Sequence, residues 1–153
     1  MPKGIATDTD WAMMKAALVE ARKGYDEGGV PVGSVVSERD KLLASGRNRR
    51  VQDGDPIAHG EMDCLRRLGR RKNYKGLTLY TTLSPCMMCA GAIVQFSVPR
   101  LVIGEAQNFP GSIDFLEQAG VEVIVLDDPE CIALAERFIL ERPDLWKEDI
   151  VED

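Results

Sequence analysis

Strand-like and helix-like segments alternate through the second half of the chain and leave few folds open to it. Three runs rich in branched and aromatic residues have the composition of buried strands. These runs are LTLYTTL at 77–83, RLVIG at 100–104 and VEVIVL at 121–126. Segments with helical spacing follow them, near 84–96, 112–119 and 128–141. Because a strand–helix–strand unit makes a right-handed crossover, we expect the three strands to be parallel neighbours in one sheet.

Three Asp-Pro or Ser-Pro pairs mark expected helix starts, because proline often follows an N-cap residue in the first turn. Asp55-Pro56 predicts a helix that runs to about Leu68. Ser84-Pro85 and Asp128-Pro129 start the helices that follow the first and last strand-like runs. Beyond residue 141, the last dozen residues are expected to form an acidic tail that contains Trp146.

The N-terminal part is expected to hold one long helix and a hairpin. Apolar residues recur at helical spacing over 8–27, with Asp8 or Thr9 as N-cap and Gly28-Gly29 as the end. Two strand-like runs, 32–36 and 41–44, flank a polar turn, and 47–58 is expected to be a loop. We therefore predict one α/β domain over 1–153, a three-layer α/β/α sandwich around a mixed sheet of about five strands.

Composition favours a cytoplasmic protein without membrane partners. Hydrophobic residues make up 44% and charged residues 29% of the 153 residues, which are ordinary globular values. No apolar run approaches the ~18 residues of a spanning helix. The first ten residues, MPKGIATDTD, show no signal-peptide pattern. The net charge of −6 disfavours nucleic acid as a partner.

One histidine and four cysteines set the possible metal chemistry. His59 is the single histidine, which excludes sites built from two or more imidazoles. The even number of cysteines permits disulfides, but the chain length and the lack of a secretory signal argue against them. A C-x-x-C pair in a cytosolic protein more often binds a metal or acts in redox chemistry.

His59 and the pair Cys86 and Cys89 together indicate a zinc site. The two cysteines stand three residues apart at the start of a predicted helix, so both thiols face one side. The positive end of that helix favours the thiolate forms. With the His59 imidazole they make three ligands that suit Zn²⁺ and leave its fourth position for water. Three protein ligands are typical of catalytic rather than structural zinc.

Glu61, two residues after His59, adds a proton carrier to this site. Zinc lowers the pKa of a bound water to ~7 and so supplies hydroxide at neutral pH. A nearby carboxylate can accept the proton of that water and deliver it to the substrate. The combined pattern, HGE at 59–61 and PCMMC at 85–89, matches the H-x-E…P-C-x-x-C signature of zinc-dependent nucleobase deaminases.

Two other interpretations of these residues leave part of the pattern unexplained. A strand that leads into a C-x-x-C helix is also typical of thioredoxin-like redox sites, but redox chemistry gives His59 and Glu61 no role. A closed structural zinc site needs a fourth ligand. Cys64 lies five positions after His59, roughly 140° around the same helix, and is expected to belong to the core, as is Cys131.

Nearly the whole chain resembles the fungal-type cytosine deaminases of the cytidine deaminase-like superfamily. The zinc motif alone indicates the superfamily, whereas HGE and the C-terminal ERPDLWKED narrow the resemblance to this branch. The stretches that carry it are GYDEGGVPVG (24–33), GRN (46–48), HGEM (59–62), LYTTLSPCMMCAGAIV (79–94), VPR (98–100), GEAQNF (104–109) and ERPDLWKED (141–149).

The resemblance implies hydrolytic deamination of free cytosine to uracil and ammonia, with one Zn²⁺ per chain. His59, Cys86 and Cys89 would hold the zinc, hydroxide would attack carbon 4, and Glu61 would protonate ring nitrogen 3. The positions that match pyrimidine hydrogen-bonding residues are Asn48, the Gly60 backbone, Ser84 and Asp149. The positions that match the apolar walls and cap are Val32, Phe109 and Trp146. The implied partners are a small pyrimidine base and a second copy of the chain, since members of this branch are homodimers.

Two departures from the branch and a basic cluster leave other functions open. Arg47 replaces the usual residue before Asn48, and the stretch after Phe109 is slightly shorter, both near the expected pocket mouth. Eleven of the 19 basic residues fall between Arg39 and Lys75, so deamination of guanine or of adenosine in tRNA is the alternative. A zinc-based or C-x-x-C redox interaction module is a further, non-enzymatic alternative.

Overall fold

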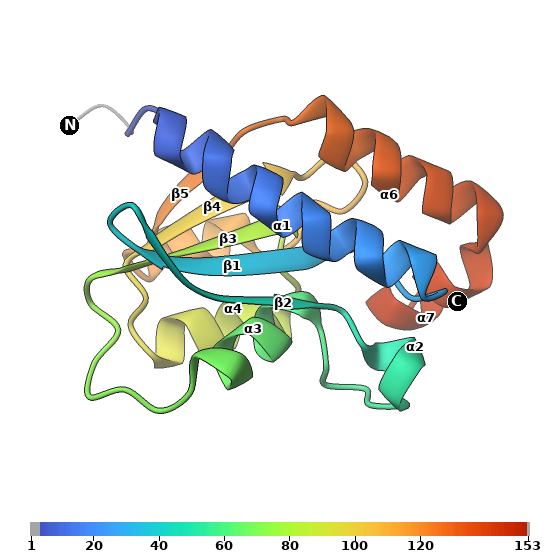
Figure 1. The fold of residues 1–153 in the computed structure, drawn as a ribbon, viewed down its shortest axis with the longest axis horizontal. Coiled ribbons are helices and arrows are strands. Elements are labelled where there is room, and N and C mark those ends of the chain that lie inside the picture. The colour runs from blue at the N-terminus through green and yellow to red at the C-terminus, as the bar shows by residue number, and fades with distance from the viewer. Residues whose placement is uncertain (1–3, 153) are drawn as a thin grey trace.

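A mixed five-stranded β-sheet lies between two layers of helices in the computed structural model, which describes residues 4–152 (Figure 1). The predicted α/β/α sandwich is therefore confirmed. Within the described residues, no helix combines the length and the apolar character needed to cross a bilayer.

Strands and helices alternate along most of the chain. The strands are β1 (Gly33–Glu38), β2 (Lys41–Arg47), β3 (Leu77–Leu83), β4 (Arg100–Glu105) and β5 (Glu122–Val125). The helices are α1 (Asp8–Asp26), α2 (Arg50–Asp53), α3 (Gly60–Leu68), α4 (Met87–Gln95), α5 (Ile113–Gln118), α6 (Pro129–Glu141) and α7 (Pro143–Ile150). The three apolar runs of the second half form β3, β4 and β5, and α6 starts after its Asp128 N-cap as predicted.

The strand order β2-β1-β3-β4-β5 places β3 at the centre of the sheet. β1 is antiparallel to β2 and β3, whereas β3, β4 and β5 are parallel, which confirms the predicted mixed sheet. Gly33 pairs with Arg47, and Ser34 pairs with Thr81. The start of β1 and the end of β2 therefore lie beside the carboxyl end of β3, and the site described below forms at this edge.

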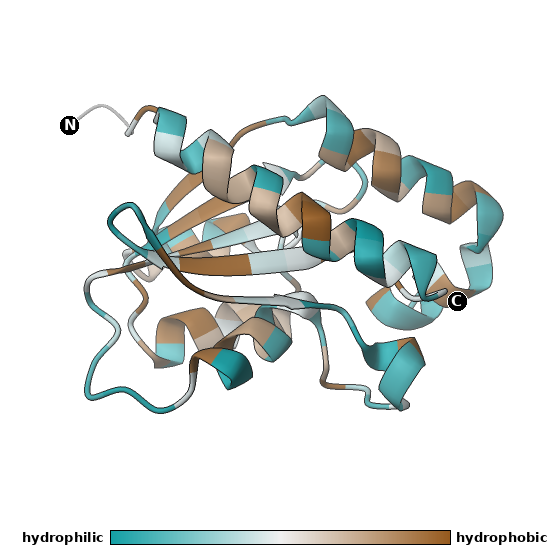
Figure 2. Cartoon of the chain, viewed as in Figure 1, coloured by the Kyte–Doolittle hydropathy of each residue, from teal (hydrophilic) through white to brown (hydrophobic). Residues whose placement is uncertain are grey.

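Different helices cover the two faces of the sheet. α1 and α6 lie over one face, and α3, α4 and α5 lie over the other (Figure 1). Figure 2 shows brown and pale strands in the middle, while α1 and α6 alternate between brown and teal stretches, as expected of helices with one buried side. A third apolar cluster lies beneath α7 and backs the site.

The starts of α3 and α4 lie further along the chain than the Asp-Pro and Ser-Pro pairs predict. α3 has His59 as its N-cap, because the Asp55 carboxylate instead accepts the backbone N–H of Ile57 and closes a local turn. α4 has Cys86 as its N-cap, so residues 84 and 85 belong to the connection from β3. Two predicted metal ligands therefore occupy the capping positions themselves.

Three further predictions are wrong in detail. The expected loop 47–58 contains the short helix α2, and the expected acidic tail forms α7, which buries Trp146 against the cluster beneath it. α1 is capped by Thr7 and not by Asp8 or Thr9 as predicted, because Thr7 and Asp10 form a reciprocal capping box.

Candidate metal centre and active site

The candidate site lies at the carboxyl end of β3, where the N-termini of α3 and α4 meet. The N-cap residues His59 and Cys86 both have extended backbone, with φ of −66° and −71°. Within residues 4–152 neither side chain caps its own helix, so the imidazole and the thiol are free to face one another. Cys89 follows in the first turn of α4 and is buried. Two helix N-termini thus direct their positive ends toward the same three side chains.

His59, Cys86 and Cys89 form a compact donor set. The Sγ atoms of Cys86 and Cys89 lie 3.5 Å and 3.8 Å from Nδ1 of His59. All three donor atoms fall within 4.8 Å of one another. Tetrahedral zinc bonds of ~2.3 Å to sulfur and ~2.0 Å to nitrogen need donor atoms about 3.5 Å apart, so the observed spacing fits zinc. The donor set predicted from the sequence is assembled in the fold.

The three donors strongly influence one another's protonation in the apoprotein. Hydrogen bonds from Cys89 and His59 lower the pKa of Cys86 to about 4. Burial alone lowers the pKa of His59, but its contact with Cys86 and the charges of Asp149 and Glu61 raise that pKa to about 9. Its contact with Cys86, together with burial, raises the pKa of the Cys89 thiol. Before a cation binds, a Cys86 thiolate therefore lies beside an imidazolium and a protonated Cys89.

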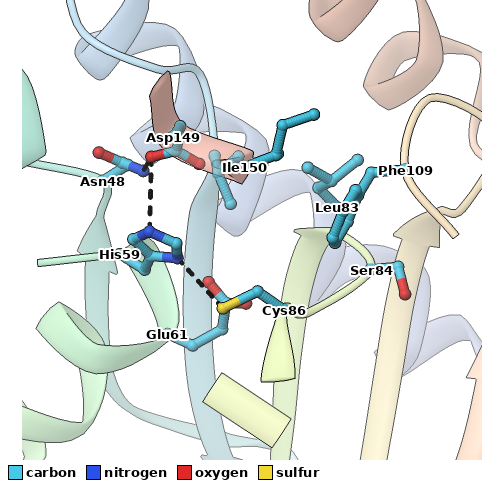
Figure 3. Close-up of a pocket in the computed structure, with 10 residues that line it drawn as sticks. Asn48, His59, Glu61, Leu83, Ser84, Cys86, Phe109, Asp149 and Ile150 are labelled. Carbon is cyan, nitrogen blue, oxygen red and sulfur yellow. Dashed lines mark hydrogen bonds and ion pairs between the residues drawn. The ribbon is translucent and has the colours of Figure 1, made fainter. Parts of the chain in front are cut away.

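Glu61 lies in the first turn of α3 and is buried, with 3% of its surface exposed. It lines the same cavity as His59 and Cys86, and all three residues are labelled in Figure 3. Burial raises the pKa of Glu61 to about 7. A carboxyl group with this pKa can both accept and donate a proton near neutral pH, which suits general acid–base catalysis.

Asp149 of α7 closes the opposite side of the cavity. Its Oδ1 atom accepts a hydrogen bond of 2.9 Å from Nδ2 of Asn48 and lies 3.5 Å from Nε2 of His59 (Figure 3). Burial raises the pKa of Asp149. The Oδ1 atom of Asn48 accepts the backbone N–H of Arg50 at 3.0 Å, which fixes the orientation of the amide. These contacts join the C-terminal helix to the metal donors.

The cavity between these groups is small and part apolar. Its volume, including the opening to solvent, is about 320 Å³. The lining residues are Val32, Asn48, His59, Glu61, Leu83, Ser84, Cys86, Phe109, Asp149 and Ile150. Leu83 and Ile150 are absent from the predicted set. Leu83 is the last residue of the apolar run that predicts β3, and Ile150 lies in the segment expected to be a tail.

Ser84 and Trp146 do not direct a side chain into the cavity, and the predicted contact at Gly60 is through its backbone. The Ser84 hydroxyl donates to the Pro110 carbonyl at 2.9 Å and points away from the cavity in Figure 3. Gly60 allows α3 to approach β1 closely, since a Cβ there would lie 2.9 Å from the Val32 carbonyl oxygen. Trp146 is buried in the cluster beneath α7, behind the lining residues.

The remaining singled-out residues lie away from the cavity. Arg47 does not lie at the pocket mouth, because its side chain faces α1, where two carboxylates neutralise it. Cys64 and Cys131 are buried in the core on opposite faces of the sheet. All four cysteines, which fall within residues 4–152, are free thiols.

One imidazole, two thiolates and a buried carboxylate at the edge of an α/β/α sandwich define a zinc-dependent hydrolytic enzyme. Residues 7–105 match the family described as the cytidine and deoxycytidylate deaminase zinc-binding region. The chain belongs to this family, which confirms the predicted zinc cofactor and the predicted enzyme class.

Individual relatives within the family differ in their substrates. A cytosine deaminase of Candida albicans is 49% identical over 142 residues, which cover 91% of this chain and 95% of that protein. A tRNA-specific adenosine deaminase of Buchnera aphidicola is 42% identical over 100 residues, which cover 63% of this chain and 65% of that protein. The solved guanine deaminase of Nitrosomonas europaea has a TM-score of 0.71 at 26% identity, over 89% of this chain and 87% of that chain.

Proposed function

We propose that this protein catalyses the hydrolytic deamination of free cytosine to uracil and ammonia. The proposal rests on the convergence of the metal donors, Glu61 and the Asn48–Asp149 pair on one small cavity. The similarity to the C. albicans cytosine deaminase covers 91% of the chain and so supports the same substrate, whereas the tRNA-specific relative covers 63%.

His59, Cys86 and Cys89 would hold zinc, which would make a bound water acidic enough to act as hydroxide near neutral pH. Glu61 accepts the proton that the water loses and donates it to ring nitrogen 3 of cytosine. A C–O bond forms at carbon 4, and the C–N bond to the amino group breaks. Glu61 then takes the proton of the hydroxyl now on carbon 4 and delivers it to the departing nitrogen, which leaves as ammonia while the C4 carbonyl of uracil forms. The raised pKa of Glu61 suits both transfers.

The lining of the cavity fits a planar, neutral pyrimidine. Asn48 offers an amide that can pair with the amide-like edge of the base, and Asp149 can accept from its exocyclic amino group. The apolar side chains that would contact the ring faces are Val32, Leu83 and Phe109. The Gly60 backbone and Ser84 complete the proposed base-binding set, and Trp146 supports the wall from behind.

Of the clustered basic residues, Arg50 lies at the opening of the cavity, beside Asp149 and Phe109, and most of the others lie away from it. Much of the cluster lies at the C-terminal end of α3 and in the loop after it, roughly 13 Å along the helix from His59. Several arginines are also paired with carboxylates. These pairs are Arg49–Asp53, Arg50–Glu148, Arg66–Asp55, Arg67–Asp63 and Arg71–Glu38. The arrangement favours a free base over a tRNA substrate.

The assignment of Glu61 is tested with Glu61→Ala and the isosteric Glu61→Gln. Zinc content measured by elemental analysis should stay near one ion per chain, while conversion of cytosine to uracil, followed by absorbance, should fall roughly 10²–10⁴-fold. Glu136→Gln, at an exposed position on α6, is the matched control and should retain full activity. Turnover by Glu61→Ala at the wild-type rate would refute the proton-transfer role.

The substrate is tested with a panel of free bases, nucleosides and tRNA assayed for ammonia release. We expect activity with cytosine and none with cytidine, guanine or adenosine in tRNA. Turnover of a neutral base should change little between 50 and 500 mM salt, whereas binding of tRNA would weaken steeply with salt. Guanine or tRNA turnover without cytosine turnover would replace the proposed substrate.

We also propose that the protein forms a homodimer and acts in the cytoplasm, in the salvage of pyrimidine bases. Met87 and Met88 at the start of α4 and Phe96 at its C-cap are exposed large apolar side chains, with Met87 59% exposed, and burial against a second copy would remove them from water. Light scattering after size-exclusion chromatography should give about twice the mass of one chain at micromolar concentration. Met87→Lys should then shift the protein toward the monomer.

A further inference from the structure

Arg47, the residue before Asn48, is the centre of a partly buried ion-pair cluster with Glu20 and Glu27. Its side chain is 15% exposed and extends from the end of β2 to α1. Nε and Nη2 donate to the two carboxylate oxygens of Glu27 at 3.0 Å and 2.8 Å, and Nη1 donates to Glu20 at 3.3 Å. The bidentate geometry with Glu27 is the strong form of the arginine–carboxylate contact.

The backbone of Arg47 is held from the other side of the sheet. Its N–H donates to Oδ2 of Asp63 on α3 at 3.0 Å. Asp63 is buried, and the same oxygen accepts from Nε of Arg67 at 3.1 Å. Residue 47 is thus tied to α1 through its side chain and to α3 through its backbone, and α3 is the helix that begins with His59.

The next residue, Asn48, has each of its polar groups occupied. Its N–H donates to the Val32 carbonyl at 2.9 Å, and its carbonyl accepts from Nε2 of Gln52 at 3.2 Å. Gln52 also donates to Glu27 at 3.0 Å, so the carboxylate that binds Arg47 is linked to Asn48 by a second route. With its amide bonded to Arg50 and Asp149 as described above, Asn48 has one orientation, and that orientation depends on the backbone at residue 47.

We propose that Arg47, held by Glu27, is a positioning residue that aligns the Asn48 amide for the pyrimidine and, through Asn48, aligns Asp149. The inference rests on the proposed function, because it names the residue that sets the geometry of that base-binding pair. A displacement of about 1 Å in a substrate-positioning group can cost about 10²-fold in catalytic efficiency. Loss of the Arg47–Glu27 pair should therefore mainly raise KM for cytosine. It should leave the three metal donors in place.

Arg47→Met keeps the aliphatic stem and removes the guanidinium, while Glu27→Gln keeps the size of the partner and removes its charge. Each should lower kcat/KM for cytosine by about 10–100-fold, mostly through a higher KM, with one zinc per chain retained. Arg47→Lys, which keeps the charge but not the bidentate fork, should lie between these variants and wild type. Arg22→Met, which removes an exposed pair between α1 and Glu130 of α6, is the control and should match wild type.

A second readout does not depend on turnover. In the ¹⁵N spectrum of the zinc-loaded protein, the Asn48 side-chain NH₂ signals are assigned by their loss in Asn48→Ala. They should shift and exchange faster with solvent in Arg47→Met and in Glu27→Gln, and should stay unchanged in Arg22→Met. Circular dichroism at the assay temperature establishes that each variant is folded, and Glu27→Gln serves the test if Arg47→Met does not fold.

The inference is overturned if the folded variants keep kcat/KM within twofold of wild type, or if the Asn48 signals do not change. A loss confined to kcat with zinc released would also overturn it, because that result places the effect on the metal centre. If wild type itself does not convert cytosine, the proposed function fails instead, and the Asn48 signals still decide whether Arg47 positions the amide.

Discussion

Nε2 of His59 lies 3.5 Å from Oδ1 of Asp149, while Nδ1 of the same ring faces the two thiols. The carboxylate that contacts the proposed substrate therefore also orients the imidazole of the metal centre. A carboxylate beside the ring nitrogen that does not bind the metal fixes the orientation and the tautomer of the imidazole, and strengthens the histidine as a metal ligand. The C-terminal helix α7 is in this way part of the zinc site as well as a wall of the cavity.

Asp149→Asn should consequently weaken zinc binding as well as turnover. We expect zinc affinity, measured by competition with a chromogenic chelator, to fall roughly 10–100-fold, because the amide is a weaker partner for Nε2. Asp144→Asn, at an exposed position on the same helix, is the control and should bind zinc like wild type. An unchanged zinc affinity in Asp149→Asn would limit the role of Asp149 to the substrate.

Zinc uptake should release about two protons per ion at pH 7. In the apoprotein His59, with a pKa of about 9, and Cys89, with a raised thiol pKa, are protonated, whereas Cys86, with a pKa of about 4, is already a thiolate. His59 and Cys89 must each lose a proton to bind zinc, so apparent affinity should rise about 100-fold per pH unit near pH 7. Calorimetry in two buffers of different ionisation enthalpy measures the release, and a value below one proton contradicts it.

Gly60→Ala should lower both stability and activity. The added Cβ would lie 2.9 Å from the Val32 carbonyl oxygen and 3.4 Å from Oγ of Ser34, so α3 must shift away from β1. We expect a loss of about 1–3 kcal/mol in the free energy of unfolding, and a lower kcat because His59 and Glu61 flank the glycine. Gly91→Ala on α4 meets open space and should instead be neutral or stabilising, which urea denaturation of both variants will measure.

The metal donor set could be predicted from the sequence because its signals are local. The spacing of Cys86 and Cys89, and of His59 and Glu61, determines which side chains share a helix start. The first residue of α3 was harder to predict, because Asp55-Pro56 is an equally good local signal for a helix start. Only the turn that the Asp55 carboxylate closes prevents the helix from starting there.

The substrate side of the site depends on contacts between distant segments. The Asn48–Asp149 hydrogen bond joins residues 101 apart in sequence, and without the family resemblance Asp149 is one charge in an acidic segment. The charged composition of 143–150 does not predict a helix, and α7 is stabilised by the burial of Trp146, while the buried Asp149 carboxylate is compensated by its hydrogen bond from Asn48. The position of the Arg47 side chain also depends on tertiary contacts and could not be predicted from local sequence. Its two partners, Glu20 and Glu27, are seven residues apart and do share a face of α1.

The ion pair between the buried Asp10 and the partly buried Arg100, far from the cavity, makes stability depend on pH in the acid range. Asp10 in α1 accepts two hydrogen bonds from the guanidinium of Arg100, at 2.8 Å and 2.7 Å, and one from the Tyr80 hydroxyl at 2.8 Å. Burial alone raises the pKa of Asp10, but these hydrogen bonds outweigh it and lower the pKa to about 2. The ordinary value is 3.8, so the shift corresponds to about 2 kcal/mol of stability.

The stability that the ionised Asp10 contributes should be complete above about pH 5 and should disappear as the pH falls from about 4 to about 2. The unfolded chain binds the proton first because its Asp10 has the higher pKa, so acid favours unfolding. Urea denaturation should show wild type more stable than Asp10→Asn at pH 7, by roughly 3 kcal/mol, with a difference about 2 kcal/mol smaller near pH 2.5. Arg22→Met, which breaks an exposed pair, should change stability by less than about 1 kcal/mol at either pH. A difference between wild type and Asp10→Asn that stays constant with pH would mean that the carboxylate charge contributes nothing to stability.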